Sequence, residues 1–282
     1  MIFLFISCEK INQFYDEPSN EERVALANQK YEAITEDTNF YKEHTVYERA
    51  VIFDRELNEI KDLDPENKKA VRSLSNAYLR KGLFKEWKYY MDKLLFMDPA
   101  SNQGSRAYTL MYQLRAYRKA LNDFYGVKAA HKGPYYIRQI NLDYLIAICH
   151  MQLGENESAL EYFEKYRKHE TIALGESYLY SSYYLYRAKV FFNMGDAKKA
   201  IEVLDQGMKR NPDFADYYFF KAEIRMAEKQ FDKAQLLNEK ALHFFENVDQ
   251  RYRYRGSRIE DLYYEDIMHQ KENIRLQAEK EL

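Results

Sequence analysis

Residues 181–212 read SSYYLYRAKVFFNMGDAKKAIEVLDQGMKRNP, and this stretch decides the fold. Tyr184, Ala188 and Phe191 follow one another at i, i+4 and i+7, which places their side chains on one face of a helix. Gly195 then ends that helix, because glycine tolerates the left-handed backbone of a helix C-terminus. The first half of the stretch therefore predicts one amphipathic helix.

The second half of the same stretch repeats the pattern. Ala200, Leu204 and Gly207 again stand at i, i+4 and i+7, and Pro212 closes the second helix. Small residues on both helices let the two backbones approach closely, and the large residues fill the space between them. The stretch therefore predicts an antiparallel helix pair.

The pair recurs at a fixed distance along the chain. Three of its small residues return 34 residues later as small residues: Ala188, Ala200 and Gly207 recur as Ala222, Ala234 and Ala241. One helix pair cannot bury its apolar faces alone, so such units must stack on their neighbours. Only 9 Gly and 5 Pro occur in 282 residues, and no strand-like alternation persists.

The unit resembles a tetratricopeptide repeat, whose length is 34 residues. The family pattern of aromatic, small, glycine and proline positions falls on Tyr184, Ala188, Phe191, Gly195, Ala200, Leu204, Gly207 and Pro212. Arg187 stands where the family has leucine. The substitution is tolerated if the alkyl part of Arg187 packs on the neighbouring helix and its guanidinium reaches water. The resemblance implies an all-α fold: a right-handed superhelical solenoid of stacked antiparallel helix pairs with a C-terminal capping helix.

The same spacing organises the rest of the chain. Pro65 and Pro99 are one period apart and each follows an Asp and an apolar helix. We expect a helical segment over residues 9–33 and about six repeats over residues 34–248. The expected units are 34–67, 68–101, 101–134, 140–173, 181–214 and 215–248.

Two segments interrupt or end this array. Extra residues near 167–180 lengthen the distance between the fourth and fifth units, and they fit a longer helix or an edge loop. They are either part of a binding face or a tolerated surface insertion. Residues 249–282 are expected to be a connector and a capping helix, whose start the Ser257 to Glu260 capping box indicates. Solenoids need such a cap to cover the last stacking face.

No catalytic, cofactor-binding or metal-binding pattern is recognisable. The six His show no ligand spacing, and no phosphate-binding glycine loop or nucleophile elbow occurs. Cys149 beside His150 suggests a nucleophile and a base, but adjacent residues on a helix point about 100° apart. We therefore expect Cys149 to be a small core residue and the protein not to be an enzyme.

Charge argues against nucleic acid as the main partner, since 43 Lys and Arg are balanced by 45 Asp and Glu. One local exception is RYRYRGSR at 251–258, where Arg could bind phosphates and the alternating Tyr could stack on bases, as in proteins that bind single-stranded nucleic acid. The other interpretation of this cluster is a solvated connector before the last helix.

The first eight residues, MIFLFISC, carry the one localisation signal. An apolar run that ends in Ser7 and Cys8 resembles the tail of a bacterial lipoprotein signal, in which the Cys is acylated. The run is incomplete, because a full signal has a charged start and a longer apolar part. Cys8 is therefore a candidate lipidation site, and a bacterial cell envelope is favoured over the cytoplasm.

The resemblance also implies where a partner binds. The first helix of each tetratricopeptide unit lines a concave groove, and family positions transfer to Arg72, Asn76, Arg80, Tyr112, Asn141, Tyr144, Ile148, Met151, Leu185, Lys189, Phe192, Asn193 and Phe219, with Glu223 and Met226 continuing the count. Arg72, Asn76 and Arg80 resemble part of a clamp for a chain-terminal carboxylate, and a plain solvated face is the alternative.

These observations lead to two functional hypotheses. The first is a non-catalytic scaffold or adaptor, envelope-associated, that binds a peptide or helix of a protein partner in the groove. The second is a cytoplasmic regulatory repeat protein that associates with RNA through residues 251–258.

Overall fold

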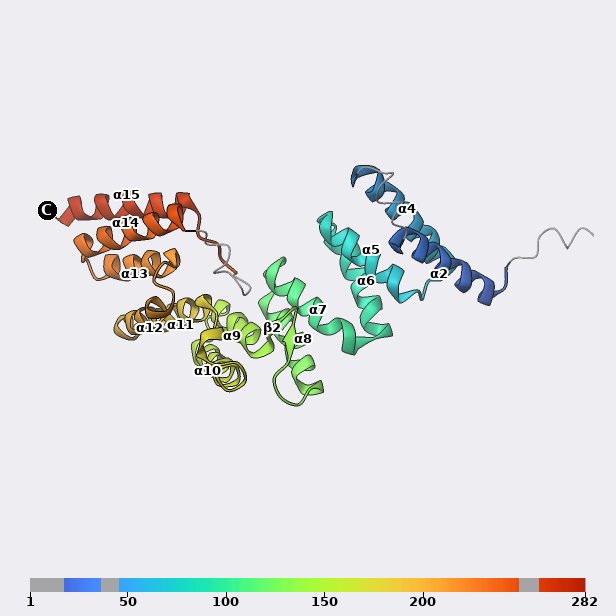
Figure 1. Ribbon diagram of the computed structural model, residues 1–282, viewed down its shortest axis with the longest axis horizontal. Coiled ribbons are helices and arrows are strands. Elements are labelled where there is room, and N and C mark those ends of the chain that lie inside the picture. Colours follow the sequence, from blue (N-terminus) through green and yellow to red (C-terminus); the bar gives the residue numbers. More distant parts are fainter. Residues whose placement is uncertain (1–17, 37–45, 249–258, 282) are drawn as a thin grey trace, which may run out of the picture. The chain divides into compact units, whose positions relative to one another are not determined.

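The computed structural model describes residues 18–36, 46–248 and 259–281. The chain divides into two compact units, Met1–Asn102 and Gln103–Leu282. The described part is almost entirely helical, and consecutive helices pack as antiparallel pairs, which confirms the predicted all-α repeat fold (Figure 1).

The first unit contains two helix pairs. α2 (Asn20–Glu36) packs against α4 (Val46–Leu63), and α5 (Lys68–Arg80) packs against α6 (Phe84–Met97). Ser19 and Glu22 exchange hydrogen bonds at the start of α2, as a capping box does. The helix of the N-terminal segment is thus the partner of α4, so the first pair starts well before the expected boundary at residue 34.

The second unit continues with α7 (Pro99–Tyr112), most of which belongs to it, followed by one single helix, three helix pairs and the C-terminal helix. These are α8 (Tyr117–Ala130), α9 (Leu142–Gln152) with α10 (Asn156–Ala173), α11 (Ser181–Asn193) with α12 (Ala197–Arg210), α13 (Ala215–Ala227) with α14 (Phe231–Asn247), and α15 (Tyr264–Glu281). Each pair also contacts the next along the chain, so a continuous core runs through the unit.

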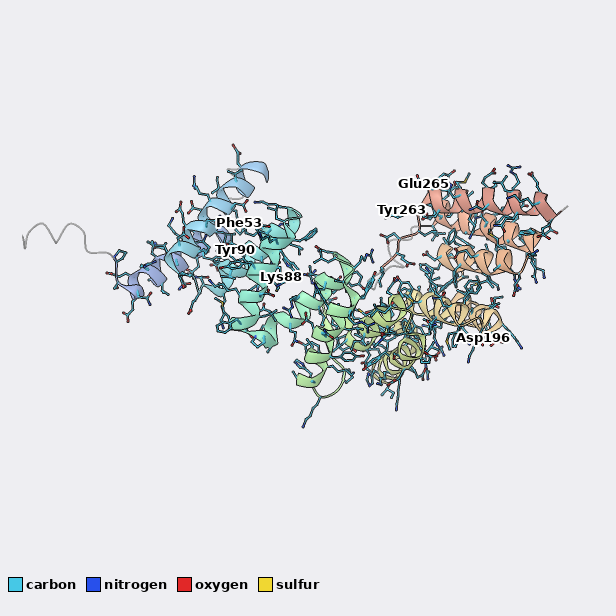
Figure 2. The ribbon with its side chains drawn as sticks, turned by 180° about the vertical axis from the view of Figure 1, so that it is seen from behind. Phe53, Lys88, Tyr90, Asp196, Tyr263 and Glu265 are labelled. Carbon is cyan, nitrogen blue, oxygen red and sulfur yellow. The ribbon has the colours of Figure 1, made fainter. Side chains whose placement is uncertain are left out.

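Small residues have the role that the repeat pattern predicted. A Cβ atom added to Gly207 would lie 2.6 Å from the ring of Tyr217, so α12 and α13 approach too closely for any side chain there. Gly195 has φ of +82°, the left-handed conformation that ends α11. Asp196, labelled in Figure 2, then caps α12 by accepting a hydrogen bond from the Lys199 amide at 2.9 Å.

Two short strands form a hairpin that the sequence did not reveal. β1 (Tyr136–Ile137) pairs antiparallel with β2 (Ile140–Asn141), and the turn residues Arg138 and Gln139 both have positive φ. Such a turn matches the twist of a hairpin. Two residues per strand are too few to leave a detectable alternation.

The insertion near 167–180 lengthens a helix. α10 extends to Ala173 and is followed by the 3-10 turn η1 (Glu176–Tyr178). On the added helical turn, buried Glu170 accepts hydrogen bonds from Tyr136 and Asn141 at 2.9 and 2.8 Å. The insertion therefore holds the hairpin against α10.

The C-terminal helix begins later than the capping box indicated. α15 starts at Tyr264, where the Tyr263 amide donates to Asp266, while Glu260 lies before the helix. α15 covers α13 and α14: buried Asn238 donates to the Ile267 carbonyl and to Gln270, and Gln270 donates to the Phe219 carbonyl. The helix thus caps the array, as expected.

Candidate functional site

Three cavities lie along α13, between α11 and the C-terminal segment, with volumes of about 500, 260 and 200 Å³. Glu223 lines all three, which makes them one continuous surface. We call this surface the α13 groove; its lining is Leu185, Lys189, Phe192, Asn193, Asp216, Phe219, Phe220, Glu223, Met226, Ala227, Glu260, Asp261, Leu262, Asp266, His269, Gln270, Asn273 and Gln277.

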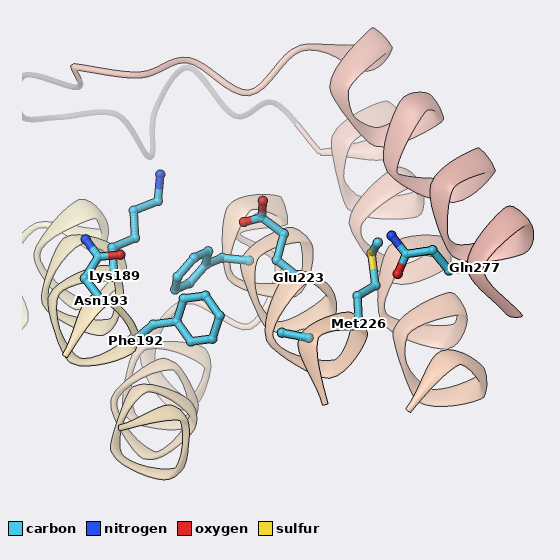
Figure 3. Close-up of a pocket in the computed structure, with 8 residues that line it drawn as sticks. Lys189, Phe192, Asn193, Glu223, Met226 and Gln277 are labelled. Atoms are coloured by element: carbon cyan, nitrogen blue, oxygen red, sulfur yellow. The ribbon is translucent and has the colours of Figure 1, made fainter. Parts of the chain in front are cut away.

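Helical spacing brings these side chains together. Lys189, Phe192 and Asn193 stand at i, i+3 and i+4 of α11, and Glu223 and Met226 are three residues apart on α13. Figure 3 shows Lys189 and Phe192 on α11, Glu223 and Met226 on α13, and Gln277 on α15 beyond them. The groove is therefore formed by three alternate helices of the array, α11, α13 and α15.

Aromatic rings form the apolar part of the groove. The rings of Phe192 and Phe220 meet edge to face, with centroids 5.8 Å apart. Lys189 Nζ lies 5.6 Å from the Phe220 ring centroid, within the range of a cation–π contact. Phe192 is half-buried, so one side of its ring remains available to a ligand.

One ion pair crosses the end of the groove. Lys189 Nζ donates to Glu260 Oε2, and Gln152 on α9 donates to Glu260 Oε1 at 3.1 Å. Burial disfavours ionisation of Glu260, but Lys189 and these hydrogen bonds outweigh burial and hold the pKa of Glu260 below its usual value. Glu260 is therefore ionised at neutral pH and joins the connector before α15 to α9 and α11.

Glu223 has the opposite electrostatic environment. Surrounding protein atoms raise the pKa of Glu223, Lys189 lowers it, and the like charge of Glu260 raises it further, so the net shift is upward. No hydrogen bond or ion pair engages its carboxylate within the described residues. Its side chain is nevertheless accessible from the open groove.

The segment Ile259–Leu262 occupies the neighbouring part of the same face. The Ile259 amide donates to the Tyr186 hydroxyl at 2.9 Å, and the Ile259 side chain belongs to the main core cluster. Leu262 packs in a smaller cluster with Ala215 and Ile267. The segment therefore lies along α11 and reaches α9 through Glu260.

The structure places the sequence-predicted groove residues of the second unit in two groups. Lys189, Phe192, Asn193 and Phe219 line the α13 groove with accessible side chains, together with Glu223 and Met226. A second group is buried in the core, although Leu185 also lines one cavity: Asn141, Tyr144, Ile148, Met151 and Leu185.

Burial of the second group departs from the expectation of an open groove. Tyr144 is fully buried, its hydroxyl shares a hydrogen bond with Ser182 at 2.6 Å, and its ring packs on Phe163 and Tyr166. Asn141 caps α9 by accepting from the Asp143 amide. These residues hold α9 to its neighbours and have no surface for a partner.

The remaining predicted residues line none of the three cavities of the α13 groove. Tyr112 is half-buried and packs on Tyr108. In the first unit Arg72, Asn76 and Arg80 are exposed along α5, and Arg72 donates to Asn102 at 3.0 Å. None of these side chains is in the lining of the cavities that contain Lys189, Phe192 and Phe219.

Sequence reasoning missed the part of the groove that the C-terminal segment supplies. Glu260, Asp266 and Gln277 come from the connector and α15, which were expected only to cap the array. Phe220 was also missed, because its neighbour Phe219 occupied the family position. The apolar stripe of α15 indicates which face packs on the array, but it does not show that the polar residues beside this face line a groove.

The other candidate sites from the sequence are either buried in the core or lie outside the described residues. Cys149 is fully buried, burial raises the pKa of its thiol, and His150 bonds to Glu155 and Tyr125 instead. No group of potential metal ligands occurs in the described part of the chain. Cys8 and residues 251–258 lie outside the described ranges. No helix within those ranges has the length and apolar character to span a membrane.

Comparison with known proteins identifies the repeat. The sequence profile of the tetratricopeptide repeat family matches residues 182–224. The search of curated proteins gave no match.

Solved structures resemble the described fold at low sequence identity. The type IV pilus biogenesis factor PilW is 14% identical, with a TM-score of 0.55 over 80% of this chain and 96% of that one. A tetratricopeptide repeat protein from Parabacteroides merdae is 16% identical, with a TM-score of 0.52 over 95% and 96%. MamA from Desulfovibrio magneticus is 15% identical, with a TM-score of 0.52 over 64% and 97%. At these identities the likeness concerns the fold.

Proposed function

We propose that this chain, which carries a tetratricopeptide repeat and folds as tetratricopeptide-repeat proteins do, is a non-catalytic scaffold that binds a peptide segment of a protein partner in the α13 groove. The observation that carries the proposal is the open surface along α11, α13 and α15, with half-buried Phe192 and Met226 beside accessible polar groups. Apolar anchors with a few polar groups around them are typical of recognition sites.

The shape of the groove favours a segment over a small molecule. Three cavities that are open to solvent follow one another along α13, so none of them encloses a ligand on all sides. An extended chain or one helix turn fills such a row by placing successive side chains in successive cavities.

Peptide selection tests this function. The full chain is immobilised and panned against a random peptide library displayed on phage, and selected peptides are then labelled and titrated in solution. We expect binding that Phe192→Ala weakens at least about tenfold, because hot-spot aromatic residues contribute about 2 kcal/mol or more.

Phe96→Ala is the matched control. Phe96 is 93% exposed on α6, in the first unit, and lines none of the three cavities, so the same truncation leaves the groove intact. Selected peptides that bind the Phe192 variant as tightly as the unchanged chain, or that lose binding only with Phe96→Ala, would place recognition elsewhere and overturn the proposal.

We also propose, as a separate matter, that Cys8 is lipidated and tethers the scaffold to a bacterial envelope. The support is the apolar run that ends in Ser7 and Cys8. Mass spectrometry of the protein from its own host decides between an acylated Cys8 and an unmodified N-terminal segment. An unmodified segment would direct the search for partners to the cytoplasm.

A further inference from the structure

The α13 groove has an excess of negative charge. Five carboxylates line its cavity of about 260 Å³: Asp216, Glu223, Glu260, Asp261 and Asp266. Lys189 is the one cation in the lining of this cavity, and it is already paired with Glu260. Among the residues that line this cavity, carboxylates therefore outnumber cations.

Lys189 shows how this groove holds a cationic side chain. Its ammonium group binds the Glu260 carboxylate, and it also lies 5.6 Å from the Phe220 ring centroid. A carboxylate at the tip and an aromatic ring beneath the stem together favour a long cationic side chain.

The same combination recurs a short distance along the groove with no occupant from this chain among the described residues. Glu223 supplies the carboxylate, and Phe192 supplies a ring that meets Phe220 edge to face. Met226 and Ala227 add apolar surface next to both. Figure 3 shows Glu223 on α13 and Phe192 on the neighbouring helix α11, with the Glu223 carboxylate pointing to the same side as Lys189.

We propose that the α13 groove selects a partner segment in which a Lys or Arg stands next to an apolar residue, with the cation on Glu223 and the apolar side chain against Phe192 and Met226. The inference rests on the proposed function and specifies its ligand. An acidic segment is disfavoured, because it would bring like charge against Glu223 and Asp266.

The test uses three matched peptide sets against the full chain. Each set consists of ten-residue random peptides with one fixed Leu, and the residue next to that Leu is fixed as Arg, Gln or Glu. Binding is measured by fluorescence polarisation at low and at high salt. We expect the Arg set to bind about tenfold more tightly than the Glu set at low salt, with the difference shrinking as salt screens the charges.

The variant Glu223→Gln isolates the proposed contact. It keeps the shape of the side chain and removes the charge, so the preference for Arg over Gln should fall about fivefold, as expected for a partly exposed pair of about 1 kcal/mol. Glu202→Gln is the control: Glu202 is exposed on α12 and lines none of the three cavities.

The outcomes separate this inference from the proposed function. Sets that bind, and that lose binding with Phe192→Ala, but show no preference for Arg, overturn the inference and leave the function standing. An equal effect of Glu223→Gln and Glu202→Gln also overturns the inference. Absence of binding by all three sets, or binding that Phe192→Ala and Phe192→Leu leave unchanged, overturns the proposed function itself. Thermal unfolding of each variant confirms that it is folded.

Discussion

The α9 section and the α13 groove are two parts of the same repeat array with opposite accessibility. Every residue of α9 from Leu142 to Met151 is buried, whereas α13 has three open cavities along it. Both helices occupy the same place in their repeats. Neighbouring helices account for the burial at α9, because Tyr144 packs on Phe163 and Tyr166 of α10 and shares a hydrogen bond with Ser182 of α11. Repeat position thus selects the candidate residues, and packing against the adjacent helices decides which of them a partner can reach.

The largest expected effect comes from truncating the buried section. Tyr144→Ala removes a fully buried ring and its hydrogen bond to Ser182, so it should lower the free energy of unfolding by about 3–5 kcal/mol. Urea denaturation measures this loss. A change below about 1 kcal/mol would mean that the Tyr144 ring is not part of the core.

Phe192→Ala makes the comparison with the open section. Because its ring is half-buried, we expect a smaller loss of unfolding free energy, about 1–2 kcal/mol, together with loss of peptide binding. Denaturation and titration of the same sample measure both quantities. A loss as large as that of Tyr144→Ala would assign Phe192 to the core instead of the groove.

A second variant separates the 259–262 segment from α11. Tyr186→Phe removes the hydroxyl that accepts from the buried Ile259 amide, and an unsatisfied buried donor costs about 1–3 kcal/mol. Hydrogen exchange by mass spectrometry should show faster exchange at Ile259 and its neighbours. Tyr178→Phe on the exposed η1 turn is the control, and equal exchange in the two variants contradicts the contact.

The Lys189 and Glu260 pair should contribute less. Both side chains are partly exposed, so a double-mutant cycle of Lys189→Met and Glu260→Gln should give a coupling energy of about 0.5–1 kcal/mol that salt reduces. Denaturation at two salt concentrations measures it. A coupling energy near zero at low salt would show that the ion pair does not hold the connector.

The smallest effect is a gain of stability. The folded state raises the pKa of Glu223 above its ordinary 4.5, so its ionisation costs stability as pH rises through the folded pKa. Glu223→Gln should therefore raise the free energy of unfolding at pH 7, by less than about 1 kcal/mol because the side chain is accessible, and should give no gain at pH 4. Denaturation at both pH values checks the sign, and a loss at pH 7 would contradict the raised pKa.

The sequence predicted the local part of this structure well. Gly207 allows the close helix approach and Gly195 ends its helix, as their spacing implied. The first role depends only on the adjacent helices, and the second depends on the backbone of one residue. The start of the C-terminal helix was wrong, because Glu260 forms its hydrogen bonds with Lys189 and Gln152, 71 and 108 residues away, and not at the helix start. The buried state of Tyr144 was also missed, because a family position carries no information on the segments that pack over it.

Hydrogen exchange of the full chain with and without a selected peptide tests the central claim most directly. We predict that the peptide slows exchange in the C-terminal half of α11, in α13 and in the adjoining face of α15, and leaves α9 and the first unit unchanged. Slower exchange confined to α10, α12 or the first unit would contradict the claim that the α13 groove is the binding surface.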